Sequence, residues 1–309
     1  MRILRPLILV GLLGCPTEVP ERVPLPTATP AALRAMVAVP AGVVRLGPRQ
    51  GWSAPPDPLP SGPAEGSEAP TWISRAGAGL GPRFVRVSAF EIDRTEVTRA
   101  DYSSFLQQTG YRLPHVGEAW AEDGWNWIST VPATGTEQHP VVLLSWYDAE
   151  AYCGWAGKRL PTEAEWQLAA LGPAKEARVF PWGQSYDGSR LNHGRMAPPN
   201  FDDQDGYART SPVGSYPSGR GPYGLHDAFG NAWEYTADLR VDSWDGVRFA
   251  HRGLSLDPRA PGPGLRVAVR GGSYYFDLEP NPAGEWAAFS PEVRRKSAGV
   301  RCARGGGQY

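Results

Sequence analysis

The chain has 309 residues, enough for one large or two small domains, and 41% of them are hydrophobic. The formal net charge is -1 and the arginines form no basic stripe, so nucleic acid is excluded as an expected partner. The 37 glycines, 32 prolines, 12 tryptophans and 12 tyrosines indicate a loop-rich fold of short elements packed by aromatic rings.

The first residues have the pattern of an export signal. Arg2 and Arg5 precede an apolar run over residues 7–13 that ends at the small residue Gly14. This run is too short to span a bilayer, which needs about 20 apolar residues. Residues 1–14 are therefore predicted to be a signal peptide.

The end of this signal resembles a bacterial lipobox. It reads Leu-Leu-Gly-Cys over residues 12–15, and the resemblance implies cleavage before Cys15 and attachment of lipid to its thiol. The expected location is the cell envelope, with the membrane reached through the lipid anchor. Pro16 stands where an acidic residue would favour the inner membrane, so the outer membrane is preferred. The alternative is an ordinary signal peptide with an accidental cysteine.

A proline-rich tether and one domain are predicted to follow. Residues 15–35 show no core-forming pattern and are predicted to be an extended tether. The composition changes at Met36, and one domain is predicted over 36–304, with 305–309 as a tail. The proline- and glycine-rich stretch 49–83 is predicted to be a surface loop of this domain, because the segments on its two sides are expected to pair.

Short strands and three helices are predicted within the domain. Residues 36–48 alternate like a strand with a turn, and 84–98 are expected to pair with them. After Pro173 only short strands and turns are expected. Apolar residues at helical spacing predict helices over 99–110, 146–156 and 162–171.

Two of these helices carry sequence signals at their starts. Ser145 is in the N-cap position of the second helix. Thr162 and Glu165 have the spacing of a capping box at the start of the third. In the second helix, Cys153 lies on the apolar face and is predicted to face the core.

The three cysteines are Cys15, Cys153 and Cys302. If Cys15 carries lipid, an even pair remains in an oxidising compartment, where a disulfide is expected. Such a bond would restrict the unfolded chain by about 5 kcal/mol in the loop-entropy model. Two buried free thiols are the alternative.

Six strings, in one order along the chain, together resemble a known family. They are EIDRTEVTRADYSSF (91–105), HPVVLLSWYDAEAYCGWAGKRLPTEAEW (139–166), FPWG (180–183), GPYGLHDAFGNAWEY (221–235), VRGGSYY (269–275) and GVRCAR (299–304). They resemble the formylglycine-generating enzyme family, also called sulfatase-modifying factors. The resemblance implies an α+β fold of the C-type-lectin-like kind, loop-rich with short strands and a few helices. It also implies a disulfide between Cys153 and Cys302.

The resemblance implies two calcium sites as well. Calcium takes about six to eight oxygen ligands from carboxylates and carbonyls. The first site would use the side chains of Asp227 and Glu234 with the carbonyls of Gly230 and Ala232. In the alternative interpretation, Asp227 caps a turn and Glu234 meets an arginine. The second site would use Asn192 and Asp205 with the carbonyls of His193 and Tyr207.

The sequence departs from the family at the copper site. The active enzymes oxidise a substrate cysteine and bind copper(I) through two cysteines that follow the GGSY string. In this chain those positions hold Phe276 and Asn281. Copper(I) prefers soft thiolate ligands, which neither residue supplies. Copper is therefore not an expected cofactor, whereas calcium is.

The histidines give no separate metal motif. They are His115, His139, His193, His226 and His251, and no pair has the close spacing of a metal triad. His139 is expected to be structural, and His226 to lie near the family's cleft. Nucleophile-elbow, Walker and dinucleotide-binding strings are absent from the sequence.

The family's substrate groove would keep an aromatic floor. It would be formed by Trp233, Ser273, Tyr274, Tyr275 and Phe276. Aromatic surfaces bind peptides or glycans through their faces and polar tips. The alternative is that these aromatic residues, Trp233 above all, belong to the core.

Three functions remain open. The leading hypothesis is a non-catalytic, calcium-stabilised envelope module that binds a protein, peptide or glycan. The second is an oxidoreductase of the same family with different chemistry; its candidate groups would be Ser273, Tyr274, Asp277, Glu279 and His226. The third is a formylglycine-generating oxidase that uses unrecognised ligands. Metal analysis separates the first two, because calcium alone favours the module and stoichiometric iron or copper favours an enzyme.

Overall fold

The structure is a computed structural model, and it describes residues 35–46, 83–122, 124–176, 178–194, 203–243, 246–250, 265–275 and 286–306. The predicted signal peptide, most of the tether and residues 49–82 of the predicted surface loop lie outside these ranges. Within them, none of the helices has the length and apolar character needed to cross a membrane.

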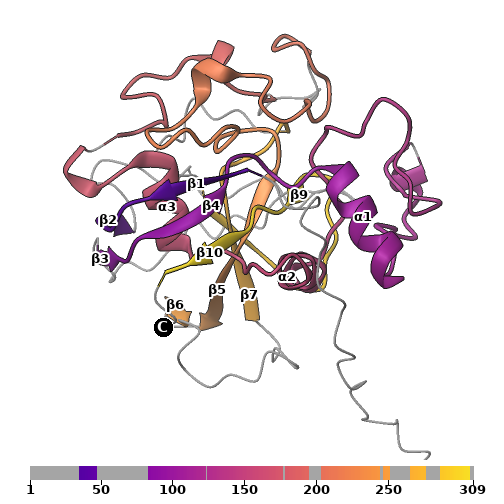
Figure 1. Ribbon diagram of the computed structural model, residues 1–309, viewed down its shortest axis with the longest axis horizontal. Helices are drawn as coiled ribbons and strands as arrows, with labels where there is room; N and C mark the ends of the chain where they lie inside the picture. Colours follow the sequence, from indigo (N-terminus) through magenta and orange to yellow (C-terminus); the bar gives the residue numbers. More distant parts are fainter. Residues whose placement is uncertain are drawn as a thin grey trace, which may run out of the picture.

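The described strands form three sheets (Figure 1). The first sheet has the order β1-β4-β10, the second pairs β2 with β3, and the third has the order β6-β5-β7-β8, with β9 paired to β5. The strands are β1 (Met36–Val39), β2 (Gly42–Leu46), β3 (Arg83–Val87), β4 (Phe90–Asp93), β5 (Trp233–Ser243), β6 (Gly246–Ala250), β7 (Leu265–Arg270), β8 (Trp286–Phe289), β9 (Ala298–Gly299) and β10 (Ala303–Gly305).

The pairing expected across the 49–83 segment is confirmed. Two strands lie on each side of this segment. Strand β2 pairs with β3 and β1 pairs with β4, both antiparallel. Strand β10 pairs with the other edge of β4, so β4 lies between β1 and the last described strand (Figure 1). Two boundaries move: β3 begins at Arg83, inside the predicted loop, and β10 extends to Gly305, inside the predicted tail.

The three predicted helices are confirmed, and each begins with a capping box. They are α1 (Arg99–Thr109), α2 (Trp146–Trp155) and α3 (Glu163–Leu171). The paired capping residues are Thr98 with Asp101, Ser145 with Asp148, and Thr162 with Glu165. In each box a side-chain oxygen accepts a backbone N–H that the first helical turn leaves without a partner. Short 3-10 turns connect these elements, at η2 (Ala119–Glu122), η3 (Ala174–Glu176), η4 (Gly188–Arg190) and η5 (Pro217–Gly219).

Aromatic rings fill the space between α1 and α2. Tyr102 and Phe105 of α1 contact Tyr152 of α2 with ring centroids 5.6 and 5.7 Å apart, and Phe105 also lies 5.4 Å from Trp155. All four rings are buried. This packing stabilises a fold with little regular structure, because large rings bury much apolar area for each ordered residue.

Strand β5 is longer than the sequence predicted. Only short strands were expected after Pro173, but β5 has 11 residues and pairs with three other strands. A register shift between Tyr235 and Leu239 interrupts its pairing with β7. Such an irregularity bends a strand locally, so the hydrophobic pattern along β5 does not keep one period.

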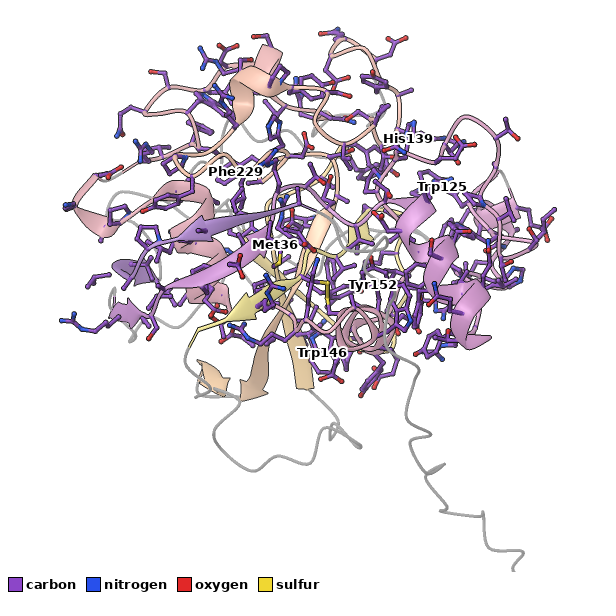
Figure 2. All side chains as sticks on the ribbon, in the orientation of Figure 1. Met36, Trp125, His139, Trp146, Tyr152 and Phe229 are labelled. Atoms are coloured by element: carbon purple, nitrogen blue, oxygen red, sulfur yellow. A yellow bond between two sulfur atoms is a disulfide. The ribbon has the colours of Figure 1, made fainter. Side chains whose placement is uncertain are left out.

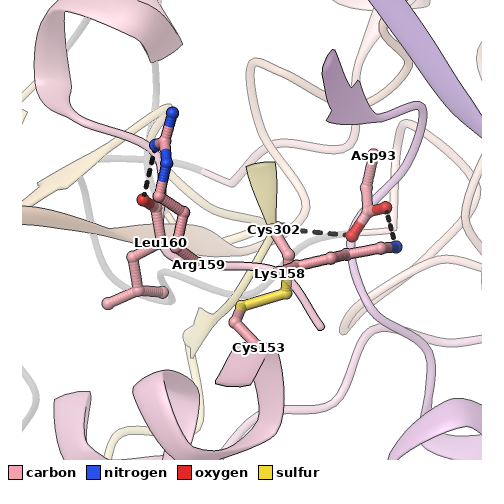
Figure 3. The surroundings of a disulfide bond; sticks show 6 residues. All are labelled: Asp93, Cys153, Lys158, Arg159, Leu160 and Cys302. Carbon is pink, nitrogen blue, oxygen red and sulfur yellow. Dashed lines mark hydrogen bonds and ion pairs between the residues drawn. A yellow bond between two sulfur atoms is a disulfide. The ribbon is translucent and has the colours of Figure 1, made fainter. Parts of the chain in front are cut away.

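The predicted disulfide between Cys153 and Cys302 is confirmed (Figure 3). It joins α2 to the chain just before β10 across a sequence separation of 149. Asp93 supports the junction, because one carboxylate oxygen accepts the Cys302 N–H at 3.1 Å and the other lies 2.5 Å from the Lys158 ammonium. Burial raises the pKa of Asp93, while the Lys158 charge acts in the opposite direction.

A buried ion pair lies one residue before this disulfide. Arg301 and Glu234 are both fully buried, and two guanidinium nitrogens of Arg301 donate to the Glu234 carboxylate at 2.9 and 2.7 Å. Trp166 of α3 donates its indole N–H to the same carboxylate at 2.7 Å. Arg301 also donates to the carbonyls of Asp93 and His226. One guanidinium thus connects β4, β5 and the loop that precedes β5.

Removal of the disulfide is expected to destabilise the fold strongly. A Cys153→Ser/Cys302→Ser variant should lose about 2–5 kcal/mol of unfolding free energy, since its unfolded chain is no longer closed into a long loop. Urea unfolding followed by circular dichroism measures the loss. Added reductant should lower the stability of the parent protein and leave the variant unchanged. Equal stability of the two oxidised proteins would contradict the expectation.

Removal of Glu234 is expected to cost more than removal of an exposed acid. Glu234→Ala leaves Arg301 as an uncompensated buried charge, which costs about 3–5 kcal/mol. The matched control is Glu91→Ala, which removes the partner of Arg304 where both side chains are about half exposed; an exposed pair contributes less than about 1 kcal/mol. The same urea unfolding experiment compares the two. Similar losses for both variants would refute a structural role for the buried pair.

Candidate functional site

The loop before β5 brings the two predicted calcium-ligand sets into contact. Asp227, Gly230 and Asn231 have φ values of 54°, 84° and 57°, in the left-handed region. A Cβ atom on Gly230 would lie 2.1 Å from the carbonyl oxygen of Asn192, so this approach requires glycine. The N–H of Asn231 donates to that same carbonyl at 3.0 Å. The loop that carries Gly230 and Asn231 therefore contacts the segment around Asn192, which is distant from it in the sequence.

The Asn192 set has an oxygen available for a cation. Asn192 is buried and donates its amide N–H to the Arg209 carbonyl at 2.9 Å, while its Oδ1 has no hydrogen-bond partner in the described part of the chain. The Asp205 carboxylate accepts the backbone N–H groups of His193 and Tyr207 at 2.6 and 3.0 Å. The four predicted residues thus lie together, and a buried amide oxygen without a partner fits a hard cation such as calcium.

The Asp227 set has its side chains engaged by protein groups. Asp227 Oδ2 accepts the Gly214 N–H at 2.5 Å, in a turn, and both Glu234 oxygens accept N–H groups from Arg301 and Trp166. The turn and the arginine of the alternative interpretation are therefore present. The described residues contain no group of three His, Cys, Asp or Glu side chains suited to a metal. Calcium at Asp227, Gly230, Ala232 and Glu234 stays a prediction.

Glu96 is a residue of this region that sequence reasoning missed. It is fully buried, and its carboxylate accepts the Asn231 side-chain N–H at 2.8 Å and the Ala232 backbone N–H at 3.0 Å. Burial raises the pKa of Glu96 well above its usual value, and the charges of Asp227 and Glu234 raise it further. The only sequence signal was its position in the first family string, which assigned it no role.

The proposed groove floor is largely part of the core. Trp233 and Ser273 are fully buried, and the Trp233 ring packs edge-on against Phe289 at 6.1 Å. Trp233 is therefore a core residue, which agrees with the alternative interpretation and not with a place in the groove floor. Tyr274 is also buried and stacks on Trp125 at 6.0 Å, whereas Tyr275 is half-buried. Phe276 lies outside the described residues.

The histidines occupy separate environments. His226 is half-buried, and its pKa is lowered by burial and by the charges of Arg301, Arg220 and Arg94. His139 lies within hydrogen-bonding distance of the Thr210 hydroxyl, at 3.2 Å from Nδ1. His115 is exposed. The remaining candidates fall outside the described residues; they are His251, Asp277, Glu279 and Asn281, the last being the second copper position.

Cations cover the aromatic rings near Tyr274, which the sequence did not predict. The Arg209 guanidinium lies 4.8 Å from the centroid of the Trp125 ring. The Lys296 ammonium lies 5.4 Å from Trp120 and 5.5 Å from Tyr275. Figure 2 shows the labelled side chains of Trp125 and His139 on the same side of the molecule as α1. These side chains come from distant parts of the chain, so spacing gave no signal for them.

Comparison with known proteins gives consistent matches over most of the chain. The sulfatase-modifying factor enzyme 1-like domain matches residues 22–305, beginning inside the predicted tether. The formylglycine-generating enzyme of Thermomonospora curvata is 33% identical over 83% of this chain and 86% of that protein. The inactive C-alpha-formylglycine-generating enzyme 2 of Bos taurus is 32% identical over 74% and 82%, respectively. Hercynine oxygenase of Mycolicibacterium smegmatis is 32% identical over 70% of this chain and 48% of that protein.

Solved structures show the same fold. PvdO from Pseudomonas aeruginosa matches with a TM-score of 0.57 and 24% identity, over 88% of this chain and 95% of that protein. Treponema denticola variable protein 1 matches with a TM-score of 0.53 and 22% identity, over 87% and 94%. These likenesses confirm the predicted α+β, C-type-lectin-like fold. Together with the domain match over residues 22–305, they establish that the chain belongs to the formylglycine-generating enzyme, or sulfatase-modifying factor, family.

Proposed function

We propose that this chain is a non-catalytic, calcium-stabilised binding module that lacks the copper oxidase activity of its family. The observation that carries the proposal is the distribution of sulfur. The chain has three cysteines, and Cys153 and Cys302 are joined to each other. The two positions that hold copper in the active enzymes carry Phe276 and Asn281. Neither side chain replaces a thiolate, so the residues present do not fit copper(I).

Family relatives support a role without this oxidation. The inactive C-alpha-formylglycine-generating enzyme 2 of Mus musculus is 32% identical over 74% of this chain and 80% of that protein. A family member that is named inactive is thus as similar to this chain as the active enzymes are. Because one fold carries many functions, the residues of the site decide between them. A fold with buried rings and surface cations suits the binding of a protein or peptide.

Calcium is proposed for the Asn192 set. Asn192 and Asp205 would hold the ion with their side chains, and the carbonyls of His193 and Tyr207 would complete the protein ligands. The buried Asn192 Oδ1, which has no hydrogen-bond partner among the residues that the structure describes, supports this assignment. The ion would stabilise the loop that carries Asp205 and would have a structural role only. A second ion at the Asp227 set would have to share Glu234 with Arg301.

Attachment at the cell envelope is also proposed. The apolar run over residues 7–13 and the lipobox-like string ending at Cys15 support a lipid anchor in the outer membrane. Radiolabelled palmitate fed to bacteria that express the full chain is expected to label the protein, and a Cys15→Ser variant is expected to stay unlabelled. Cys153→Ser serves as the matched control and should keep the label. Labelling of Cys15→Ser would contradict the anchor.

One observation favours a different function. Hercynine oxygenase of Mycolicibacterium smegmatis is 32% identical to this chain, so oxidative chemistry other than formylglycine formation occurs among its relatives. The candidate groups within the described residues would be Ser273, Tyr274 and His226. Ser273 and Tyr274 are buried, and His226 lies among arginines whose charges lower its pKa. An environment of arginines opposes the binding of a further cation, so this function takes second place.

Metal analysis of the purified, folded and oxidised protein tests the proposed function. Calcium is expected as the bound metal, and a cysteine-containing sulfatase peptide incubated with the protein and copper is expected to stay unoxidised by mass spectrometry. The formylglycine-generating enzyme of Thermomonospora curvata serves as the positive control. Stoichiometric iron or copper, or formation of formylglycine, would overturn the proposal.

Variants of the two ligand sets extend the same experiment. Asn192→Ala and Asp205→Asn are expected to lose one calcium ion per chain and the thermal stabilisation that calcium gives. That stabilisation is about 2.7 kcal/mol when calcium is present at about 100 times its Kd. Asp187→Asn, which changes a partly exposed carboxylate at the start of η4, is the control and should keep the ion. Glu234→Gln reports on the Asp227 set, because a second ion there would be lost from this variant alone.

A further inference from the structure

Arg99, the first residue of α1, is a buried cation with little compensation. Arg99 is only 7% exposed. Its one side-chain hydrogen bond is to the Thr136 hydroxyl at 3.3 Å, and its Nε has no partner among the described residues. The ion pairs of the described part of the chain do not include Arg99. A buried guanidinium without a carboxylate is costly, so this position indicates a missing anion.

The groups around Arg99 add to the positive charge. The pKa of Arg99 is lowered by burial and then by the charge of Arg209, while Tyr274 acts in the opposite direction. His139 accepts the Arg99 backbone N–H through its carbonyl at 2.9 Å, and the charge of Arg99 lowers the pKa of His139. The charge of Glu137 acts on His139 in the opposite direction. Thr210, the residue after Arg209, lies within hydrogen-bonding distance of His139, at 3.2 Å from its Nδ1. The segments that carry Arg99 and Arg209 therefore meet at His139.

The helix end does not account for this charge pattern. The N-terminus of α1 is already capped, because Asp101 accepts the Thr98 N–H at 2.9 Å and the Thr98 hydroxyl at 2.5 Å. The uncompensated group is the Arg99 side chain itself. Arg209 is exposed beside it, with its guanidinium on the Trp125 ring. Arg209 is thus open to solvent, whereas Arg99 is buried.

The aromatic faces here are already covered, which bears on the kind of ligand. A neutral sugar binds by stacking on an open ring face. In this region Arg209 covers Trp125, and Lys296 lies over both Trp120 and Tyr275. The surface offered to a ligand is therefore cationic, with rings behind the cations. Such a surface favours an anionic ligand over a neutral glycan.

Resting on the proposed binding function, we propose that Arg99 and Arg209 form a carboxylate-binding site for an acidic peptide segment of a partner protein. The planar guanidinium group matches a carboxylate in a two-point contact, which an ammonium group does not. A glutamate or aspartate side chain at Arg99 would supply the buried counter-charge that the described part of the chain does not provide. Lys296, over the neighbouring rings, would meet a second acidic residue of the same segment.

Calorimetric titration of the calcium-loaded protein with hexaglutamate tests this site, with hexaglutamine as the neutral control peptide. Hexaglutamate is expected to bind, and Arg209→Gln and Arg99→Gln are each expected to weaken binding about tenfold or more, because a hydrogen-bonded charge contact is lost. Arg304→Gln, which removes an exposed arginine paired with Glu91, is the matched control and should bind as the parent does. Arg99→Lys keeps the charge but loses the two-point geometry, and it should also bind more weakly.

Arg209 is exposed, so its variant tests the site even where substitution of buried Arg99 impairs folding. Equal binding of hexaglutamate and hexaglutamine, or unchanged affinity in Arg209→Gln, would overturn the site. Tighter binding of an oligogalacturonate, which carries its carboxylates on sugars, would overturn the assignment to a peptide. Calcium as the bound metal together with a failed titration would remove this inference alone, whereas bound copper or iron would remove the proposed function.

Discussion

The buried pair between Arg301 and Glu234 is the interaction on which the rest of the molecule depends. One guanidinium donates to Glu234 of β5, to the carbonyl of Asp93 at the end of β4 and to the carbonyl of His226. A buried charge is tolerated only where its donors are satisfied, so these segments can adopt only one relative arrangement. The next residue, Cys302, adds α2 through the disulfide. Most strands of this fold are short. The Arg301 contacts and the neighbouring disulfide therefore hold together elements that are joined by few backbone hydrogen bonds.

The two predicted calcium-ligand sets differ in how they relate to this buried pair. Glu96 is acted on by the carboxylates of Asp227 and Glu234, with Arg301 as the opposing charge, and its pKa is raised mainly by burial. The carboxylates in that network already have protein donors. The Asn192 set differs, because it combines one carboxylate with a neutral amide whose oxygen has no donor among the described residues. Calcium at the Asn192 set would share the Asp205 carboxylate with the backbone N–H groups of His193 and Tyr207, whereas calcium at the Asp227 set would compete with a guanidinium.

Local signals in the sequence predicted the local structure. Apolar spacing predicted α1, α2 and α3, with an N-cap signal for α2 and a capping box for α3. The pairing of strands across the 49–83 segment followed from their alternation. The disulfide followed from the cysteine count and the family strings. Burial of Trp233 and an arginine partner for Glu234 were held only as alternatives. The contacts of Arg301 with Asp93 and His226 and the cations over the rings were not predicted. Those features join residues as far as 208 positions apart, and no pattern of spacing reports on such contacts.

The replacement of the two copper-binding cysteines by Phe276 and Asn281 changes which ligands this member of the family can bind. A copper site acts through soft ligands at fixed positions, and the positions that follow Tyr274 and Tyr275 lack them. Nearby, Arg209 and Lys296 lie over aromatic rings, with Arg99 buried behind. Exposed cations attract a partner from a distance and are screened by salt, whereas a buried cation contributes after water is displaced. An acidic partner would thus be attracted by exposed Arg209, contacted by half-buried Lys296 and retained by Arg99.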